Sequence, residues 1–322
     1  MKRGILLINI GTPETPTKKA VSSYLKEFLN DPYVIVMPKV LRYLLVNGII
    51  IPFRAGKSTK RYQQLWTKEG SPLLVHLQSL QTKLQTIFND EYTVFGAMSY
   101  GKPQLSEVLR EIEKHNFDEL IVVPLYPHYT TSTTLSAIEG VKKHTAHWKN
   151  TTITNIKSFY QEEPFIEALS KRISSYRIED YDHLLFSYHS LPLKQVKSSC
   201  EGDDSTECYE KACYGTTELL AKALNLQTSD YSTAFQSNIS DRWLAPYTKD
   251  ILKELAQKGK KKVLVITPSF VADCLETTVE IGQEYRDDFI KMGGSELRLV
   301  ECLNDAPYWV EALAKIIRHK TH

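Results

Sequence analysis

The sequence predicts an α/β protein whose strands form doubly wound parallel sheets. Short runs rich in β-branched residues alternate with longer amphipathic stretches along all 322 residues. Each short run is almost wholly apolar, which is typical of parallel strands covered by helices on both faces. The repeated order of strand and then helix is characteristic of an open α/β sheet. A single core rarely grows beyond about 250–300 residues, so we expect two domains.

The predicted strands and helices follow one another in a regular order. Strands are expected over residues 4–9, 92–98, 119–125, 152–159, 183–188, 231–236, 262–267 and 297–302. Helices are expected over residues 74–88, 103–115, 163–175, 209–225, 245–258, 272–291 and 306–319. A natural break near 148–162 divides the pattern into a domain over 1–155 and a domain over 156–305. The last helix, 306–319, is free to pack back on the first domain.

Composition and motifs argue against several classes of function. The 40 Lys and Arg residues nearly balance the 38 Asp and Glu residues, and the net charge of +2 lacks the basic excess of a dedicated nucleic-acid binder. No G-x-G-x-x-G or Walker sequence follows a predicted strand, so dinucleotide and phosphate-loop sites lose their main support. No apolar run reaches the roughly 20 residues that span a bilayer. The first apolar run leads into Gly-Thr-Pro instead of a cleavage site, so we expect a cytoplasmic protein.

The segment 38–54, PKVLRYLLVNGIIIPFR, is unusually apolar and carries basic residues at both ends. One interpretation is a buried helix. The alternative is an interfacial helix lying on a membrane surface, which the basic flanks and the limited length also fit.

Two strand ends carry side chains suited to proton or metal chemistry, and ligands of open sheets bind beyond the carboxyl ends of strands. His189 directly follows one strand, within FSYHSLP. Asp273, Glu276 and Glu280 follow another at i, i+3 and i+7, which predicts one face of a helix. A buried structural imidazole and a solvated acidic face are the simpler interpretations. Together these residues indicate a cleft that handles protons or metal ions.

Two further strand ends supply aromatic and hydroxyl groups. One is PLYPHYTTSTT, with Tyr126 and His128, whose simpler interpretation is a turn followed by a helix cap. The other is FQSNISDRW, with Gln236, Ser237 and Trp243, where the tryptophan is as readily a core residue. A cleft lined by such groups suits a large flat ligand better than a small polar one.

The five cysteines are an odd number in a chain without a predicted secretion signal, which argues against a disulfide framework. Cys200, Cys208 and Cys213 form the pattern C-x7-C-x4-C, which is not a standard zinc spacing. Free structural thiols are the expected state.

Seven segments together resemble the ferrochelatase family: LLINIGTPETP, YLKEFLNDPYVI, GSPLL, PLYPHYTTSTT, FSYHSLP, FQSNISDRWLAPYT and SFVADCLET. The resemblance runs from Gly4 to about Ile317, and FSYHSLP and SFVADCLET are its most specific parts. It implies a chelatase-like fold, in which two Rossmann-like doubly wound domains with four-stranded parallel sheets face across a porphyrin cleft. It also implies an enzyme of haem biosynthesis that inserts ferrous iron into a porphyrin and needs no cofactor beyond that iron.

The resemblance assigns roles to residues of this chain. His189 and Glu276 match the family's catalytic and metal-contacting positions. Asp273 and Glu280 match the accompanying acidic positions, which relay protons or the metal. Metallation removes two pyrrole protons, so a neutral imidazole is a suitable acceptor while carboxylates guide the ion. The expected porphyrin contacts are Ile10, Tyr100, Tyr126, Ser237 and Trp243.

Three positions depart from family patterns. Ser99 stands where a basic residue is expected, so contact with the porphyrin acid chains falls to Tyr100 or a loop lysine. Cys274 stands where many relatives carry a histidine, and we expect it to be a packing residue. Ile10 is apolar, as in the branch of the family that uses protoporphyrin IX. Protoporphyrin IX is therefore the predicted substrate, with coproporphyrin III as the alternative.

The resemblance also bears on partners. A few bacterial members hold a 2Fe–2S cluster through four cysteines after the catalytic histidine, whereas only Cys200, Cys208 and Cys213 are present here, so a cluster would need a non-cysteine ligand. The segment 38–54 matches the lip of the active-site mouth, which favours peripheral docking on the inner membrane. We expect a monomer or weak dimer without nucleic-acid partners. One rival is a non-catalytic porphyrin or haem carrier on the same scaffold, which would need no acidic residues opposite a histidine. The second is a chelatase of the same class that acts on sirohydrochlorin with cobalt or iron, which the FSYHSLP segment disfavours.

Overall fold

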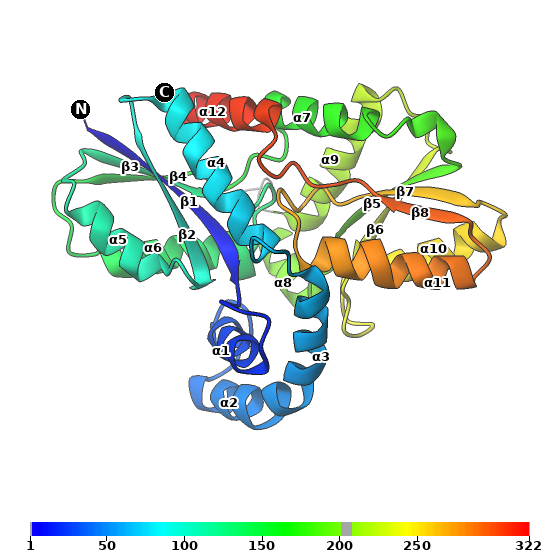
Figure 1. The fold of residues 1–322 in the computed structure, drawn as a ribbon, viewed down its shortest axis with the longest axis horizontal. Coiled ribbons are helices and arrows are strands. Elements are labelled where there is room, and N and C mark those ends of the chain that lie inside the picture. The colour runs from blue at the N-terminus through cyan, green and yellow to red at the C-terminus, as the bar shows by residue number, and fades with distance from the viewer. Residues whose placement is uncertain (1, 201–207, 322) are drawn as a thin grey trace. The chain divides into compact units, whose positions relative to one another are not determined.

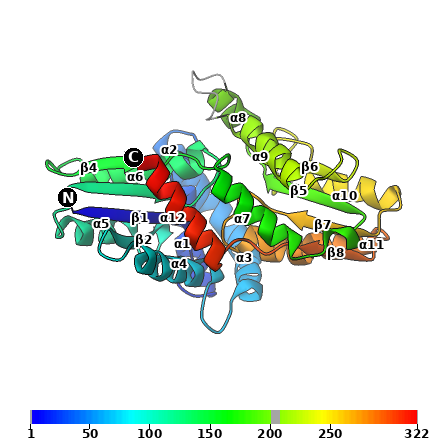
Figure 2. The same ribbon diagram turned by 90° about the horizontal axis from the view of Figure 1, so that it is seen from above.

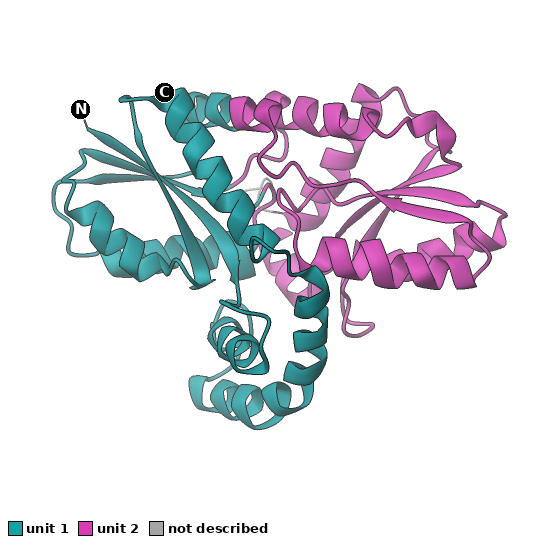
Figure 3. Ribbon diagram, in the orientation of Figure 1, with its two compact units in different colours: residues 1–126, 130–157, 313–322 teal, residues 127–129, 158–312 magenta. Residues whose placement is uncertain are grey.

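The computed structural model describes residues 2–200 and 208–321, which form two compact units (Figures 1 and 3). Unit 1 comprises Met1–Tyr126, Thr130–Lys157 and Leu313–His322. Unit 2 comprises Pro127–Tyr129 and Ser158–Ala312. Each unit contains its own four-stranded sheet.

The sheet of unit 1 consists of β1 (Arg3–Thr12), β2 (Thr93–Gly101), β3 (Glu119–Pro124) and β4 (Thr152–Asn155). All neighbouring strands are parallel, in the order β2-β1-β3-β4. The side chains from Ile5 to Ile8 in the central strand β1 are fully buried. Burial on both faces explains why this strand has a continuous apolar run instead of an alternating one.

Helices cover both faces of the unit 1 sheet (Figure 1). The apolar residues of α5 (Leu105–Glu113) and α6 (Ser136–Thr145) pack on one face. On the other face lies α4 (Pro72–Phe88), which contacts β1 and β2. A π-helical turn, η2 (Thr131–Leu135), precedes α6, and the Thr130 hydroxyl caps it by accepting a hydrogen bond from the Thr133 N–H.

A helical path after α1 (Lys18–Leu29) contains the apolar segment 38–54. It consists of α2 (Lys39–Leu44), the π-helical turn η1 (Leu45–Ile50) and α3 (Ile51–Leu65). Val46 and Ile51 are buried against Leu29 of α1. The interpretation of the whole segment as a buried helix is wrong, because a second set of large apolar side chains is 56–82% exposed: Val40, Leu41, Tyr43, Leu44, Ile49 and Phe53.

The sheet of unit 2 consists of β5 (His183–His189), β6 (Tyr231–Gln236), β7 (Lys262–Ile266) and β8 (Glu296–Leu299). Its strands are also parallel, in the order β6-β5-β7-β8. On one face pack α10 (Thr248–Gln257), the π-helix η5 (Leu275–Tyr285) and α11 (Arg286–Lys291). On the other face lie α7 (Glu163–Ser174) and α9 (Tyr209–Ala223), which contact each other (Figures 1 and 2). The described residues also form η3 (Ile178–Asp180), which is a single short turn, α8 (Leu193–Cys200) and α12 (Pro307–Thr321).

The predicted fold class is confirmed, because the two sheets are parallel and alternate with helices in sequence. A strand is present in every segment where one was predicted, although β4 ends at Asn155 instead of residue 159. The last helix, α12, begins in unit 2 and ends in unit 1. There, Arg318 donates a hydrogen bond to Glu91 at 3.1 Å. No helix within the described residues has the length and apolar character of a membrane span.

Candidate active site at the strand ends of unit 2

His189 is the last residue of β5 and is half-buried. Its Nδ1 lies 2.6 Å from the carbonyl oxygen of Ser190. A carbonyl oxygen only accepts hydrogen bonds, so Nδ1 carries the hydrogen and the neutral ring has its lone pair on Nε2. The backbone contact therefore selects the tautomer whose Nε2 can accept a proton or bind a metal ion.

The backbone around His189 is tied to neighbouring segments. The Tyr209 hydroxyl donates to the His189 carbonyl oxygen at 2.7 Å. The Ser190 N–H donates to the Gln236 carbonyl at 2.8 Å, and the Ser190 hydroxyl donates to the Leu244 carbonyl at 2.8 Å. These bonds fix the position of the Ser190 carbonyl, and through it the orientation of the imidazole.

Gln236 connects the ends of two strands to the helix that carries the acidic residues. Its fully buried side chain accepts a hydrogen bond from the Ser187 hydroxyl of β5 at 2.8 Å. Its amide nitrogen donates to the Glu276 carbonyl oxygen at 2.8 Å. The first turn of η5, with the half-buried Glu276 side chain, is thereby anchored beside the carboxyl ends of β5 and β6.

Glu280 is a buried carboxylate, 7% exposed, that two hydroxyl groups satisfy. The Ser237 hydroxyl lies 2.9 Å from both carboxylate oxygens, and the Tyr285 hydroxyl donates to Oε1 at 2.7 Å. Ser237 has a φ of 64°, an uncommon conformation for a residue other than glycine. The bond to Glu280 accompanies this conformation, which is typical of residues held in place at functional sites.

The acidic residues do not form the predicted face of an α-helix. The helix begins at Leu275 and is a π-helix over its first eleven residues, a rare geometry that often occurs at functional sites. Asp273 precedes it and accepts hydrogen bonds from the Asn304 side chain at 2.6 Å and from the Cys302 N–H at 3.2 Å. The predicted i, i+3, i+7 stripe is therefore wrong for Asp273, which faces the segment after β8, while Glu276 and Glu280 lie on η5.

Cys274 caps the start of η5. Its N–H donates to the Thr277 hydroxyl at 3.0 Å, and its side chain is 7% exposed. Burial, together with the neighbouring Glu276 carboxylate, raises the pKa of the Cys274 thiol well above its ordinary value. The thiol is thus a protonated packing group at this position.

The predicted contacts of unit 1 lie at the carboxyl end of its own sheet. Ile10 is half-buried near the end of β1. Tyr100 is 5% exposed, and its hydroxyl donates to Asp31 at 2.9 Å, next to a second donor from Ser136 at 2.8 Å. Burial raises the pKa of the Tyr100 phenol. An internal carboxylate thus accepts from Tyr100, which differs from the predicted contact with a substrate acid chain.

Unlike the Tyr100 hydroxyl, the hydroxyl oxygens of Ser99 and Tyr126 are buried without a hydrogen-bond partner. Burial raises the pKa of the Tyr126 phenol, and the nearby Ser99 hydroxyl opposes that rise although no well-formed hydrogen bond joins them. Buried polar groups normally have partners, so these two hydroxyls are unusual among the buried polar groups of this sheet end. In unit 2, Trp243 is half-buried and pairs with Pro192, three residues after His189.

Tyr209, which supports His189, is packed against His128, a residue that the sequence placed at a strand end. His128 is 2% exposed, and burial lowers its pKa to about 3. Its Nε2 lies 2.8 Å from the Thr216 hydroxyl, which itself donates to the Ala212 carbonyl, so Nε2 donates and Nδ1 is left without a partner. The ring contacts the ring of Tyr209, the residue that supports His189. No sequence signal marks Tyr209, because its partner is a backbone carbonyl.

The expectation of free thiols is wrong for two of the cysteines. Cys200 and Cys208 are joined by a disulfide, whereas Cys213 is a buried free thiol. The odd number of cysteines argued against a framework of several disulfides, but it does not exclude a single disulfide. In this state Cys213 is the one free thiol of the three. Within the ranges 2–200 and 208–321, no group of three or more His, Cys, Asp or Glu side chains is arranged to hold a metal ion.

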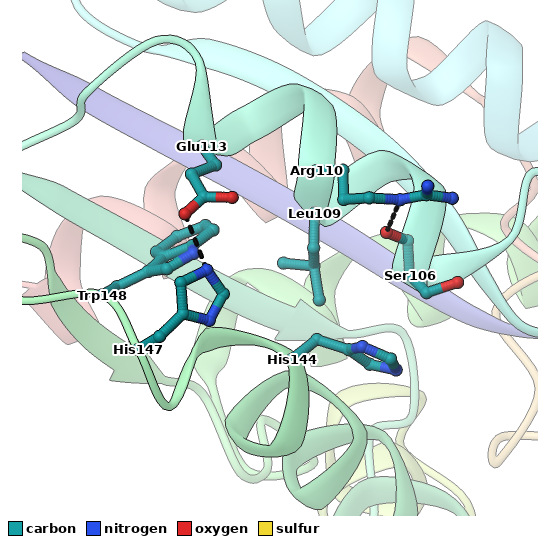
Figure 4. Close-up of a pocket in the computed structure, with 7 residues that line it drawn as sticks. All are labelled: Ser106, Leu109, Arg110, Glu113, His144, His147 and Trp148. Carbon is teal, nitrogen blue, oxygen red and sulfur yellow. Dashed lines mark hydrogen bonds and ion pairs between the residues drawn. The ribbon is translucent and has the colours of Figure 1, made fainter.

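A separate pocket of about 370 Å³ lies between α5 and α6 of unit 1 (Figure 4). Within it, His147 and Glu113 are in contact at 2.7 Å, and both are largely exposed. The pocket contains none of the predicted site residues. Its lining consists of Ser106, Leu109, Arg110, Glu113, His144, His147 and Trp148.

Comparison with known proteins gives one consistent family. The ferrochelatase family model matches residues 2–321. A ferrochelatase of Legionella pneumophila (strain Philadelphia 1) is 43% identical, covering 99% of this chain and all of the relative. A ferrochelatase of Coxiella burnetii (strain CbuG_Q212) is 40% identical, covering 98% and 93%. Among solved structures, SirB from Bacillus subtilis with Fe3+ has a TM-score of 0.58 at 11% identity over 99% and 96% of the chains. CbiX, from siroheme biosynthesis, has a TM-score of 0.53 at 12% identity over 98% and 99%.

Proposed function

We propose, since the chain belongs to the ferrochelatase family and is a metal chelatase, that it inserts ferrous iron into protoporphyrin IX. The observation that carries the proposal is the state of His189. Its Nδ1–H is committed to the Ser190 carbonyl, so its Nε2 lone pair is available at the end of β5. Insertion of iron requires a group of this kind, because two pyrrole protons must leave as the ion enters.

In the proposed mechanism, the single lone pair of His189 Nε2 first contacts the incoming iron and, once the iron has passed to the porphyrin nitrogens, accepts one pyrrole proton. The second pyrrole proton passes to the Glu276 carboxylate. Glu276, anchored through Gln236, is the carboxylate that guides the divalent ion. Glu280, four residues after Glu276 on η5, is held by Ser237 and Tyr285 and supports the relay as a buried acidic group. Asp273 contributes less directly, since its oxygens are occupied by Asn304 and Cys302. Iron is a substrate in this scheme. The acceptor of one pyrrole proton is the His189 ring, which the Ser190 carbonyl orients.

The choice of porphyrin rests on the residues of unit 1. Ile10 is an apolar side chain at the end of β1, suited to the vinyl edge of protoporphyrin IX and not to an extra carboxylate. The unpartnered hydroxyls of Ser99 and Tyr126 are the groups best placed to meet a propionate, in place of the missing basic residue. Trp243 supplies an aromatic face for the macrocycle.

The segment 38–54 supports peripheral contact with a membrane, and we propose a cytoplasmic protein that docks on an anionic lipid surface. Exposed Leu44 and Phe53 would enter the lipid, while Lys39 and Arg54 face its head groups. Arg42 is not one of these cations, because its guanidinium is buried and donates to the Met37 carbonyl at 2.8 Å. Monomer and weak dimer both remain compatible with this arrangement.

Anaerobic incubation of the purified chain with ferrous iron and each porphyrin tests the function directly. We expect the porphyrin absorbance to change to that of haem with protoporphyrin IX, and more slowly with coproporphyrin III. Faster turnover of coproporphyrin III would overturn the choice of substrate. Tight binding of either porphyrin without metallation would instead identify a carrier.

A further inference from the structure

The Cys200–Cys208 disulfide lies next to Tyr209, the residue whose hydroxyl donates to the His189 carbonyl, because Cys208 directly precedes Tyr209 in the sequence. Cys208 is the N-cap residue of α9, and its carbonyl accepts the first helical hydrogen bond, from the Ala212 N–H, at 3.0 Å. Tyr209 follows directly and donates to the His189 carbonyl at 2.7 Å. Cys208 and Tyr209 are 1% and 3% exposed. Because both side chains are packed on all sides, a displacement of either one also displaces the first turn of α9.

We propose that Cys200 and Cys208 form a thiol–disulfide switch that acts on His189 through Tyr209. The closed disulfide fixes the first turn of α9 and, with it, the Tyr209 hydroxyl. Reduction releases Cys208 from α8 and weakens the hydrogen bond to His189. The Ser190 carbonyl that orients the imidazole is the next acceptor along the chain. It is then held only by the Ser190 bonds to Gln236 and Leu244, so the ring is oriented less firmly. The switch rests on the proposed function only in that His189 is taken as catalytic.

The difference in solvent exposure between Cys200 and Cys208 decides which sulfur atom a reductant attacks. Cys200 is half-buried while Cys208 is buried, so a thiolate of a dithiol reductant attacks the Cys200 sulfur. The bond between the two sulfurs breaks, and Cys208 leaves as a thiolate and takes up a proton. The second thiolate of the reductant then attacks the mixed disulfide, which releases Cys200 and closes the reductant's own disulfide. Two electrons pass from the reductant to the protein, and an oxidised dithiol reverses the reaction.

The other cysteines are not suited to this exchange. Cys213, Cys274 and Cys302 are all buried, and burial raises the pKa of each thiol well above its ordinary value. A buried thiol that stays protonated is a poor nucleophile. Disulfides persist in oxidising compartments and are reduced in reducing ones, so the Cys200–Cys208 pair senses the thiol balance around the protein.

The test uses the full chain treated with reduced or oxidised dithiothreitol, with the cysteine state measured by alkylation and mass spectrometry. We expect reduction to lower kcat about fivefold, the factor for one lost hydrogen bond, with little change in KM. The ¹⁵N signals of the His189 ring should shift at the same time. Cys200→Ser should reproduce the reduced protein under both treatments.

Tyr209→Phe separates the switch from a general loosening of the fold. It should keep the disulfide, show the lower kcat and no longer respond to reduction, whereas Tyr214→Phe on the same helix should respond as the unchanged protein does. A kcat and His189 signal that do not change on verified reduction would overturn the switch, as would a Tyr209→Phe protein that still responds. If neither form metallates a porphyrin, the proposed function fails, and the His189 signal alone then decides on the switch.

Discussion

The hydroxyl of Tyr285 donates a hydrogen bond of 2.7 Å to the carboxylate of Glu280, five residues earlier on the same helix. A spacing of five is that of the hydrogen bonds of a π-helix, and η5 has this geometry from Leu275 to Tyr285. The wide helix thus places a donor over a buried acidic side chain that an α-helix would direct elsewhere.

Removal of that donor should weaken both the fold and the reaction. Tyr285→Phe leaves Glu280 with one hydroxyl partner, so we expect a loss of about 1–3 kcal/mol in the free energy of unfolding, measured by urea denaturation. Ser237→Ala should lower kcat further, because the Ser237 hydroxyl lies within hydrogen-bonding distance of both oxygens. Unchanged stability and turnover in both variants would contradict the role given to Glu280.

His189→Ala should abolish iron insertion while the fold stays intact. Loss of a general base typically costs about 10²–10⁴-fold in rate. The control is His183→Gln at the other end of β5, where the ring is 6% exposed and contacts Ser232 at 2.8 Å. That variant should lose stability and keep its turnover per folded molecule. Near-normal activity of His189→Ala, measured by porphyrin absorbance, would remove His189 from the mechanism.

Acid should destabilise the protein through its buried histidines. Burial lowers the pKa of His128 to about 3 and, mainly through burial, that of His183 to about 4. The unfolded chain takes up these protons near its ordinary pKa of about 6.5, so it binds more protons than the native state between about pH 6.5 and 4. Stability is therefore complete above this window and falls as pH decreases through it.

The slope should approach about 1.4 kcal/mol per pH unit for His128, and be smaller for His183, whose pKa is lowered less. Urea denaturation at several pH values measures it. His128→Gln keeps a donor for Thr216 and should remove part of the slope. An identical slope in that variant would show that other groups cause the acid sensitivity.

The exposed apolar stripe of the segment 38–54 should control lipid binding. Leu44→Ser together with Phe53→Ser removes two side chains that are 59% and 82% exposed. Each is worth about 1.5–3 kcal/mol when fully buried, so we expect flotation with anionic vesicles to fall at least tenfold. Ile239→Ser, at a position 69% exposed in unit 2, is the matched control and should float as before. Equal flotation of all three proteins would rule out docking through this stripe.

Gly11 should be intolerant of any side chain. Its φ is 116°, and a Cβ there would overlap the carbonyl oxygen of Tyr100 on β2. Gly11→Ala should therefore cost about 3 kcal/mol or more and lower Tm strongly. Gly56→Ala, in α3 with open space around it, should instead raise stability by about 0.5–1 kcal/mol. Calorimetry of the two variants would contradict this account if Gly11→Ala melted like the unchanged protein.

Features that depend on local pattern were predicted correctly from the sequence. Continuous apolar runs located each strand of the described residues. The sequence also placed His189 at the end of one of these strands, where β5 ends. The placement of Asp273 was wrong because a helix start and a π-helical turn leave no mark in the spacing of charges. Tyr209 and the Cys200–Cys208 bridge were missed because each depends on a partner that the fold brings close. Contacts to backbone atoms lack any residue-type signature.

The path of the chain between the units limits how the protein can be divided. Unit 1 takes its polypeptide from three separate stretches, the last being Leu313–His322, and unit 2 takes its own from two. A gene divided after residue 157 would therefore give an N-terminal product that lacks Leu313–His322 of unit 1. The C-terminal product would carry that segment without the rest of unit 1 to pack against. An autonomous version of unit 1 needs a circularly permuted gene in which the end of α12 is rejoined to Lys2 by a linker.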